Sequence, residues 1–218
     1  MFRSAFATPP EHTFKLYYFP LRGRAEFIRL MLTYLNVKFE DHRVRKDEWH
    51  NFKPRTPMGH LPVLEVDGKE TLCQATAIGR YIAREYGLAG KGNIEMAQAD
   101  MLVDGVWDCW EHLQGVYRDQ QKGDIQLMVQ SWARFYDQHL KMFLDRYQKF
   151  LEENRSGWLV GNGVTWADFA VGEFLAVLRD CFTQDALDSY SVLVAYTDKV
   201  ISLPHVKEYI AKRERAPF

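Results

Sequence analysis

The stretch from Pro57 to Tyr86, PMGHLPVLEVDGKETLCQATAIGRYIAREY, constrains the fold of this chain more than any other. Val63 to Val66 is rich in β-branched residues and predicts a strand, and Asp67-Gly68 supplies a positive-φ turn before a second strand, Glu70 to Cys73. From Gln74 onward the apolar residues follow helical spacing. The stretch therefore predicts a hairpin that leads directly into a helix, whose first N–H groups would favour an anionic ligand.

The segment before this hairpin predicts a strand, a helix and a second strand. Phe14 to Phe19 is aromatic and apolar enough for a buried strand, and Val37 to Val44 alternates as another. Between them, apolar residues recur at the spacing of one helical face, at Ala25, Ile28, Leu32 and Leu35. The first part of the chain is thus expected to have the order β-α-β followed by β-β-α.

The rest of the chain has helical spacing throughout. Gly87 and the run from Gly90 to Asn93 indicate a boundary near residue 90. A long helix is predicted from Ala99 to Tyr117, and another from Trp132 to Leu151, after a polar loop at Gly123. Within the sequence Thr165-Trp166-Ala167-Asp168, Thr165 and Asp168 have the spacing of a capping box, to which we assign a structural role.

These patterns divide the chain into four parts. Residues 1–13 are expected to form a flexible extension, residues 14–89 an α/β domain, residues 90–98 a linker and residues 99–218 an all-helical domain. An organelle-targeting remnant is the alternative for the first thirteen residues.

Composition excludes several classes of function. The formal net charge of −1 and the pI of about 6.7 give no basic stripe for nucleic acid or an anionic membrane surface, and no apolar run approaches a spanning helix. The three cysteines lack CxxC spacing, which disfavours a disulfide framework, a zinc site and thiol–disulfide exchange. A small-molecule function in a reducing cytoplasm fits these features.

The sequences GHLPVLEVDG and LCQATAIGRYIA resemble the glutathione-binding half of cytosolic glutathione transferases, most closely the sigma class. The resemblance covers Phe14 to Phe218. It implies a thioredoxin-like first domain with a mixed four-stranded sheet and a helical-bundle second domain. In the family, the residue before a cis-proline pairs through its backbone with the cysteinyl part of glutathione, and a Gln-Ser pair holds the γ-glutamyl end. The matching residues are Leu61 with Pro62, and Gln74 with Ala75.

The run YYFPLRGRAE resembles the family motif in which a tyrosine donates a hydrogen bond to the glutathione sulfur. The resemblance assigns this role to Tyr18 rather than Tyr17, with Arg24 nearby; the residues alone leave open a core tyrosine at Tyr18. A thiol has a reference pKa near ~8.5, so catalysis requires stabilisation of the thiolate.

The resemblance extends to the residues that bind the glycine carboxylate of glutathione. Trp49 and Lys53, four residues apart, supply an indole N–H and an ammonium donor. Two positions depart from the family pattern, because His60 replaces a glutamine and Ala75 replaces a serine. Loss of the serine hydroxyl removes a hydrogen bond to a charged group, which contributes about 1.5–3 kcal/mol.

Asp108 matches the family aspartate that reaches across a homodimer to the glutathione amino group of the other subunit. Some related prostaglandin D synthases bind a divalent metal with a neighbouring aspartate, where this chain has Trp107. We therefore expect a homodimer and no metal.

The resemblance implies conjugation of the glutathione thiolate to hydrophobic electrophiles, a detoxification activity with glutathione as co-substrate. Two alternatives remain: a glutathione-dependent isomerase like prostaglandin D synthase, and a non-catalytic binding or crystallin-like protein. The residues expected to line the electrophile site are Phe19, Arg24, Trp110, Leu113 and Phe218.

Overall fold

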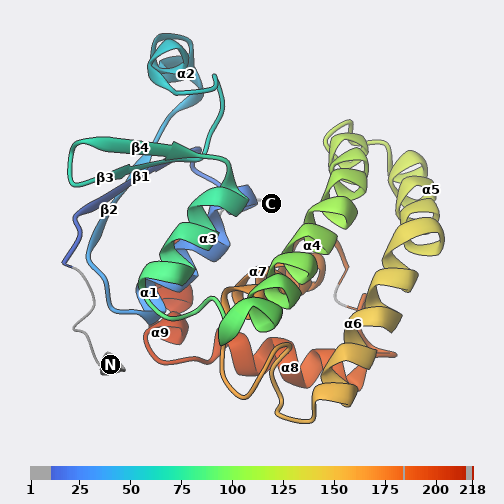
Figure 1. Ribbon diagram of the computed structural model, residues 1–218. Coiled ribbons are helices and arrows are strands. Elements are labelled where there is room, and N and C mark those ends of the chain that lie inside the picture. Colours follow the sequence, from blue (N-terminus) through green and yellow to red (C-terminus); the bar gives the residue numbers. More distant parts are fainter. Residues whose placement is uncertain (1–10, 184, 215–217) are drawn as a thin grey trace. The chain divides into compact units, whose positions relative to one another are not determined.

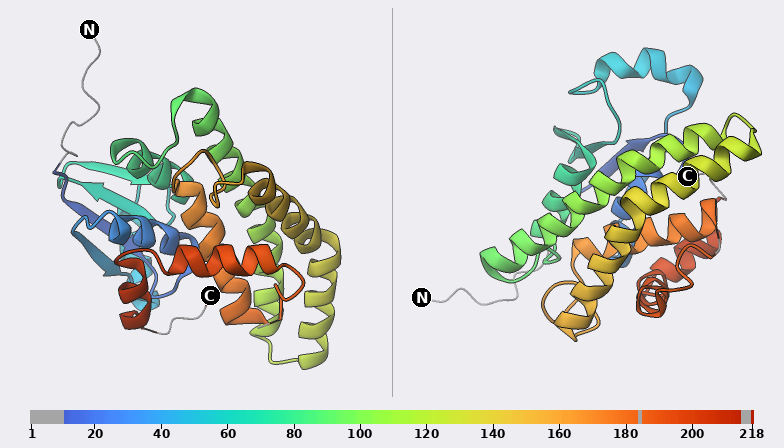
Figure 2. Two further views of the ribbon diagram at one scale, coloured as in Figure 1. Left: turned by 90° about the horizontal axis from the view of Figure 1, so that it is seen from below. Right: turned by 90° about the vertical axis from the view of Figure 1, so that its right-hand side faces the viewer.

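The computed structural model describes residues 11–183, 185–214 and 218 (Figure 1, Figure 2). The chain divides into two units, the first ending at Leu88 and the second beginning at Ala89. Among the described residues, no helix is long and apolar enough to cross a membrane.

The first unit is built on a four-stranded mixed sheet with the strand order β2-β1-β3-β4. β1 is parallel to β2 and antiparallel to β3, which forms a hairpin with β4. The predicted Asp67-Gly68 turn joins the hairpin, with φ values of 55° and 65°. The predicted topology is therefore confirmed. The elements of this unit are β1 (Phe14–Tyr18), α1 (Glu26–Tyr34), β2 (Phe39–Arg43), α2 (Lys46–Phe52), β3 (Val63–Val66), β4 (Glu70–Cys73) and α3 (Ala75–Glu85).

The two faces of the sheet are covered differently. On β1, every second side chain, Phe14, Leu16 and Tyr18, is buried. Helices α1 and α3 pack together on this face: the Arg29 guanidinium of α1 lies 5.7 Å from the centre of the Tyr18 ring, and Phe14 meets the ring of Tyr81 of α3 edge-on (Figure 1). The other face has the short helix α2, which was not predicted as a separate element.

The second unit contains only helices among its described residues. At its centre is α7, in which every residue is buried and which packs against α4 and α8 (Figure 1, Figure 2). The elements are α4 (Gly92–Gln120), α5 (Ile125–Phe135), α6 (Lys141–Asn154), α7 (Trp166–Val177), α8 (Ser191–Ile201) and α9 (Val206–Lys212).

Two boundaries in the second unit differ from the sequence prediction. Helix α4 begins at Gly92, so residues 92–98 of the expected linker are helical; the Glu95 carboxylate accepts the Lys91 N–H at 2.6 Å and caps this end. The long helix expected from Trp132 to Leu151 is interrupted by a π-helical turn, Tyr136–Leu140, between α5 and α6. Apolar spacing does not reveal a single inserted residue of this kind.

His12 and Thr13, the last two residues of the predicted extension, are bound to the turn of the hairpin. Residues 1–10 of the predicted extension lie outside the described residues. The Thr13 N–H donates to Asp67 Oδ1 at 2.8 Å, and His12 Nδ1 lies 2.8 Å from Asp67 Oδ2. The prediction of flexibility therefore does not hold at these two residues, because the hairpin turn supplies a carboxylate that binds them.

The predicted capping box is confirmed at the start of α7. Asp168 is fully buried and accepts hydrogen bonds from the N–H and hydroxyl of Thr165, the N–H of Leu159 and the hydroxyl of Tyr196, at 2.7–3.1 Å. Burial raises the pKa of the Asp168 carboxyl, while the donors oppose that rise. The same carboxylate thus caps α7 and joins it to α8.

Asp168→Ala should destabilise the second unit severely. The substitution leaves buried donors without an acceptor, so we expect a loss of about 3–5 kcal/mol in the free energy of unfolding. The matched control is Asp124→Ala at the exposed start of α5, where the side chain accepts only the Leu127 N–H and removal costs about 1 kcal/mol. Urea unfolding followed by tryptophan fluorescence measures both, since five of the six tryptophans lie in this unit. Equal losses in the two variants would contradict the structural role of Asp168.

Candidate functional site

Tyr18 is the last residue of β1, and its hydroxyl is held at the turn that starts the first helix. The side chain is 8% exposed, and its hydroxyl oxygen accepts the backbone N–H of Arg24 at 3.0 Å. Gly23, with φ of +44°, opens the 3₁₀ turn Gly23–Ala25 that precedes α1. A Cβ at Gly23 would lie 2.5 Å from the Tyr18 hydroxyl, so only glycine fits this approach.

The surroundings of Tyr18 keep its phenol neutral. Burial raises the pKa of Tyr18, while the Arg24 N–H and the charges of Arg24 and Arg29 lower it by less. The phenol is therefore protonated at neutral pH. Because the hydroxyl oxygen is an acceptor in the bond from Arg24, its proton remains available for donation to an anion.

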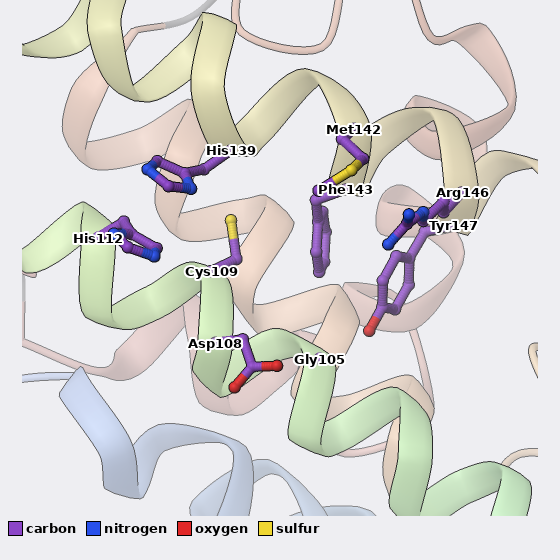
Figure 3. A pocket seen from close by; sticks show the side chains of 9 residues that line it. All are labelled: Gly105, Asp108, Cys109, His112, His139, Met142, Phe143, Arg146 and Tyr147. Carbon is purple, nitrogen blue, oxygen red and sulfur yellow. The ribbon is translucent and has the colours of Figure 1, made fainter.

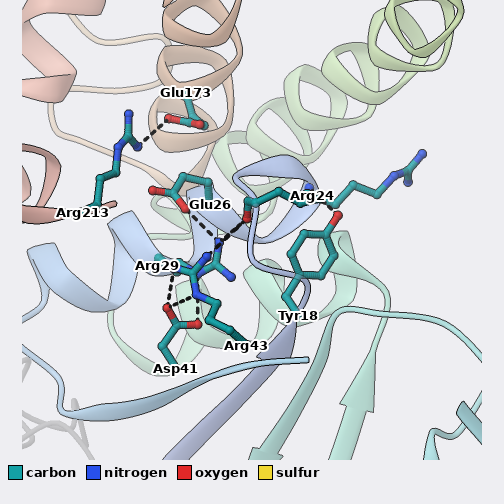
Figure 4. A network of polar contacts seen from close by, with 9 residues as sticks. Tyr18, Arg24, Glu26, Arg29, Asp41, Arg43, Glu173 and Arg213 are labelled. Atoms are coloured by element: carbon teal, nitrogen blue, oxygen red, sulfur yellow. Dashed lines mark hydrogen bonds and ion pairs between the residues drawn. The ribbon is translucent and has the colours of Figure 1, made fainter. Parts of the chain in front are cut away.

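A buried ion cluster fixes the turn after Tyr18 (Figure 4). Arg29 is fully buried and donates to Glu26 at 2.8 Å, to Asp41 at 3.1 Å and to the carbonyl of Leu21 at 3.0 Å. Arg43 pairs with the same Asp41 at 2.6 Å and also donates to Leu21 at 3.4 Å. Two guanidinium groups thus hold one carbonyl of the turn between β1 and α1.

Tyr17 lies on the opposite face of the sheet. Its hydroxyl donates to Glu65 at 3.2 Å, and its ring lies 5.1 Å from that of Phe52 and 5.2 Å from that of His42. Successive side chains of a strand point to opposite faces of the sheet, so the Tyr17 side chain lies away from the turn that holds the Tyr18 hydroxyl.

Other predicted residues of the first unit lie on α2 and on the loop before β3. Trp49 is half-buried, with its ring 5.5 Å from and edge-on to that of Phe19, and Lys53 follows α2 in an exposed position. The methylene stem of Lys53 passes Gly59, next to the exposed His60. The Leu61–Pro62 peptide bond is cis.

The start of α3 leaves several backbone donors outside the helical ladder. Gln74 has φ of 73° and precedes the helix without capping it; its side-chain amide contacts the Met58 sulfur at 4.0 Å. The first helical hydrogen bond runs from the Ile78 N–H to the Gln74 carbonyl at 3.0 Å. The N–H groups of Ala75, Thr76 and Ala77 therefore have no acceptor within the helix, and an anion can bind there.

Asp108 lies in the second unit, exposed on α4 at one side of a groove of about 270 Å³ (Figure 3). Within the groove, the rings of His112 and His139 stack with centroids 3.5 Å apart, and burial and the neighbouring His112 lower the pKa of His139. Burial raises the pKa of the Cys109 thiol to about 12, so this thiol stays protonated and is no nucleophile. Among the residues described, no three or more His, Cys, Asp or Glu are grouped to hold a metal ion.

The five residues expected at the electrophile site differ in burial. Phe19 and Arg24 of the first unit are half-buried. In the second unit, Trp110 and Phe218 are buried and stacked with ring centroids 4.6 Å apart, and Leu113 is fully buried. Leu113 therefore exposes no surface in this structure.

Sequence reasoning missed the residues that position Tyr18. Glu26 and Arg29 interrupt the apolar helix α1 at a spacing of three, which was the available signal for a buried ion pair. Asp41 and Arg43 come from β2, and nothing local to their sequence indicates that they contact the turn.

Comparison with protein families gives matches over most of the chain. Residues 13–84 match the model described as glutathione S-transferase, N-terminal domain, and residues 111–213 match the model described as glutathione S-transferase, C-terminal domain.

Individual proteins match over nearly their whole length. Glutathione S-transferase 1 of Ascaris suum is 38% identical, over 94% of this chain and 98% of its own. Human hematopoietic prostaglandin D synthase is 37% identical, over 92% and 96%. The crystal structure of a monomeric glutathione S-transferase of the hookworm Necator americanus superposes with a TM-score of 0.85 at 32% identity, over 94% of this chain and 100% of that one.

Gly23→Ala should destabilise the protein more than an alanine at another left-handed glycine. It adds a contact with the Tyr18 hydroxyl to the strain of a left-handed alanine, so we expect a loss of roughly 2–5 kcal/mol in the free energy of unfolding. The control is Gly68→Ala, where φ is +65° and no atom lies within 4 Å, with an expected loss of about 1–2 kcal/mol. Urea unfolding compares the two, and similar losses would show that the approach to Tyr18 carries no strain.

Proposed function

The chain belongs to the glutathione S-transferase family, and we propose that Tyr18, supported by Arg24, activates the glutathione thiol by donating a hydrogen bond to the thiolate. Members of this family transfer glutathione to electrophiles. This chain is 38% identical to a relative named as a glutathione S-transferase, so it has this activity too. What we propose is the set of residues and the manner in which they act.

The observation that carries the proposal is the bond from the Arg24 N–H to the Tyr18 hydroxyl. This bond orients the phenol and leaves its proton unused. Since a free thiol has a pKa near ~8.5, only a few per cent is nucleophilic at neutral pH. A neutral phenol donor with a nearby guanidinium stabilises the anionic sulfur relative to the thiol, which lowers the pKa of the bound thiol.

The rest of glutathione is proposed to bind along the first unit. Trp49 and Lys53 would hold the glycine carboxylate, the backbone of Leu61 before Pro62 the cysteinyl part, and Gln74 with the Ala75 N–H the γ-glutamyl carboxylate. The uncapped start of α3 supports the last of these assignments. His60 lies near the glycyl end in this arrangement and would place an imidazole where the family pattern has a glutamine amide.

The electrophile is proposed to be hydrophobic and to contact Phe19, Arg24, Trp110 and Phe218, whereas Leu113 is fully buried and is not proposed as a contact. A related candidate reaction is a glutathione-dependent isomerisation like that of prostaglandin D synthase, favoured by 37% identity to the human enzyme of that name. Parallel assays with an aryl halide and with a prostaglandin endoperoxide distinguish the two. Absence of thiolate absorbance and of turnover with either would favour the non-catalytic alternative.

Sigma class, a detoxification role, a cytoplasmic location and a homodimer complete the proposal. All three cysteines are free thiols, which is compatible with a reducing compartment. The homodimer is proposed because Asp108 matches the family aspartate that contacts glutathione in the other subunit. A monomer is the alternative, since the similar hookworm structure is described as monomeric.

Tyr18→Phe should separate glutathione binding from thiol activation. We expect little change in glutathione affinity, a fall of about a hundredfold in kcat/KM, and a rise of about one unit in the pKa of the bound thiol, followed by thiolate absorbance. Tyr17→Phe is the control, because the Tyr17 hydroxyl donates to Glu65 on the opposite face and its loss should alter none of the three quantities. If Tyr17→Phe lowers kcat/KM and Tyr18→Phe does not, the assignment to Tyr18 is wrong and the activating residue lies on the opposite face of β1.

Asp108→Ala tests the dimer. If the partner's site uses this carboxylate, glutathione affinity should fall by about tenfold, the loss of one hydrogen bond to a charged group. The control is Asp104→Ala, an exposed aspartate one turn earlier on α4 that does not line the groove. Sedimentation of the wild type at micromolar concentration gives the oligomeric state. A monomer, with unchanged affinity in both variants, would refute the role and the assembly together.

A further inference from the structure

The end of strand β2 contacts the turn that carries the Tyr18 hydroxyl at two points. The N–H of Val44, one residue beyond β2, donates to the Tyr18 carbonyl at 2.7 Å. The Arg43 guanidinium donates to the Leu21 carbonyl at 3.4 Å, beside the 3.0 Å bond from Arg29 to the same oxygen. The turn between β1 and α1 is therefore held from the neighbouring strand as well as from α1.

Asp41 of β2 binds both of these guanidinium groups (Figure 4). Its Oδ1 accepts the Nε–H of Arg29 at 3.1 Å, and its Oδ2 accepts the Nε–H of Arg43 at 2.8 Å and lies 2.6 Å from Arg43 Nη2. In each arginine it is Nη1 that donates to the Leu21 carbonyl. Because a guanidinium is planar, a bond at Nε fixes the direction of the other donors, so one carboxylate orients both groups.

The register of the sheet brings Asp41 to this side of the strand. Across the parallel ladder of β1 and β2, Asp41 is paired with Leu16. Two residues later, Arg43 is paired with Tyr18. Leu16 and Tyr18 are buried on the face that α1 covers, and every second residue of a strand lies on the same face. Asp41 and Arg43 therefore project toward α1, where Arg29 meets them.

We propose that Asp41 is a positioning residue for thiol activation. By orienting the two guanidinium groups it keeps the Leu21 carbonyl in place, and the turn then holds the Tyr18 hydroxyl on the Arg24 N–H with the phenol proton free for the sulfur. The inference rests on the proposed function, in which Tyr18 donates to the thiolate. Asp41 acts only through these groups, so it is not a catalytic residue.

The charge of Asp41 and its positioning role have opposite effects on a bound thiolate. A carboxylate disfavours a second anion in its vicinity, so the loss of its charge alone would lower the pKa of the bound thiol. The loss of positioning would raise that pKa, because the phenol would spend less time in the orientation that stabilises the sulfur anion. A role in stability alone would leave the thiol pKa unchanged. The sign of the change in Asp41→Asn therefore separates the three.

The first experiment follows thiolate absorbance of bound glutathione across pH. In Asp41→Asn we expect the thiol pKa to rise by about half a unit, which lowers kcat for an aryl halide about threefold at a pH below that pKa. The KM for glutathione should stay unchanged, because the groups proposed to bind the peptide lie on α2, before β3 and at the start of α3. An unchanged or lowered thiol pKa would overturn the proposal.

Glu40→Gln is the matched control, one residue earlier on β2. Glu40 pairs with Lys15 at 2.8 Å, so this variant also removes one carboxylate and one ion pair between β1 and β2. Since side chains alternate along a strand, Glu40 projects from the face opposite to Asp41. The thiol pKa should not change in this variant. An equal rise in both variants would show that the loss of any ion pair on β2 has this effect, and the assignment to Asp41 would be wrong.

The second experiment measures amide hydrogen exchange by NMR in the absence of glutathione. The Arg24 N–H should exchange faster in Asp41→Asn, because its bond to the Tyr18 hydroxyl opens more often. The Ile78 N–H, which bonds the Gln74 carbonyl at the start of α3, should keep its rate. Tyr18→Phe lacks the acceptor and gives the upper limit for Arg24. Equal acceleration of both amides would mean general destabilisation and would contradict the proposal.

Arg43→Gln decides the question if Asp41→Asn does not fold. It removes one of the two donors to the Leu21 carbonyl and leaves the buried Arg29 with its own partners. Exchange at Arg24 and the thiol pKa should both rise, by less than in Asp41→Asn. Unchanged exchange in folded Arg43→Gln would overturn the inference.

The two readouts separate a failure of the inference from a failure of the proposed function. If Tyr18→Phe raises the thiol pKa while Asp41→Asn changes neither this pKa nor the exchange of Arg24, the inference fails and the proposed function stands. If the wild type forms no thiolate on binding glutathione although Asp41→Asn accelerates exchange at Arg24, the proposed function fails, while the positioning of the bond between Arg24 and Tyr18 by Asp41 stands.

Discussion

The position of the Tyr18 phenol depends on one buried cation, Arg29. Its guanidinium is fully buried, and it is neutralised by Glu26 and Asp41 while it also donates to the Leu21 carbonyl. Removing one partner of a buried ion pair typically costs about 3–5 kcal/mol, since the remaining charge stays in a medium of low polarity. The turn between β1 and α1 is therefore fixed by an interaction that tolerates little displacement. Tyr18, at the end of β1, and the Arg24 N–H, at the start of the helix, are brought into hydrogen-bonding distance by that turn.

The two units contribute different kinds of chemical group. The first supplies directed polar groups: a phenol proton, an indole N–H, an ammonium and the uncapped N–H groups of α3. The phenol is oriented by the Arg24 N–H and the N–H groups of α3 by the helix, and all four kinds of donor suit an anion. The second supplies stacked rings and a groove with histidines, in which burial keeps Cys109 protonated. Burial thus removes Cys109 as a nucleophile.

Residue spacing predicted those secondary-structure elements that depend on local sequence. The hairpin, the helix after it and the order of elements along the first unit follow from alternation and from turn residues such as Asp67-Gly68, whereas the mixed four-stranded sheet was predicted from the family resemblance. The capping box of Thr165 and Asp168 was predicted from spacing, but the hydrogen bonds that Asp168 accepts from Leu159 and Tyr196 were not. The π-helical turns escaped prediction because apolar spacing does not reveal a single inserted residue. The contacts of the ion cluster around Arg29 escaped it for the same reason as those of the capping box. They depend on which partners from distant segments satisfy a buried group, and no local pattern encodes that choice. The role of each candidate site residue in binding stays a prediction.

The departure at Ala75 can be weighed by magnitudes. Its side chain is 4% exposed at the first position of α3, and a serine hydroxyl there would add one donor to a bound carboxylate. That donor contributes about 1.5–3 kcal/mol, more than the 0.3–1 kcal/mol typical of the helix dipole acting on an exposed charge. The dipole alone therefore does not replace it. The N–H groups of Ala75, Thr76 and Ala77 have no acceptor within the helix, and each provides a directed bond of the same kind as the missing one. In the proposed binding mode, a carboxylate that engages two of them retains most of the stabilisation, so the alanine would weaken this subsite without abolishing it.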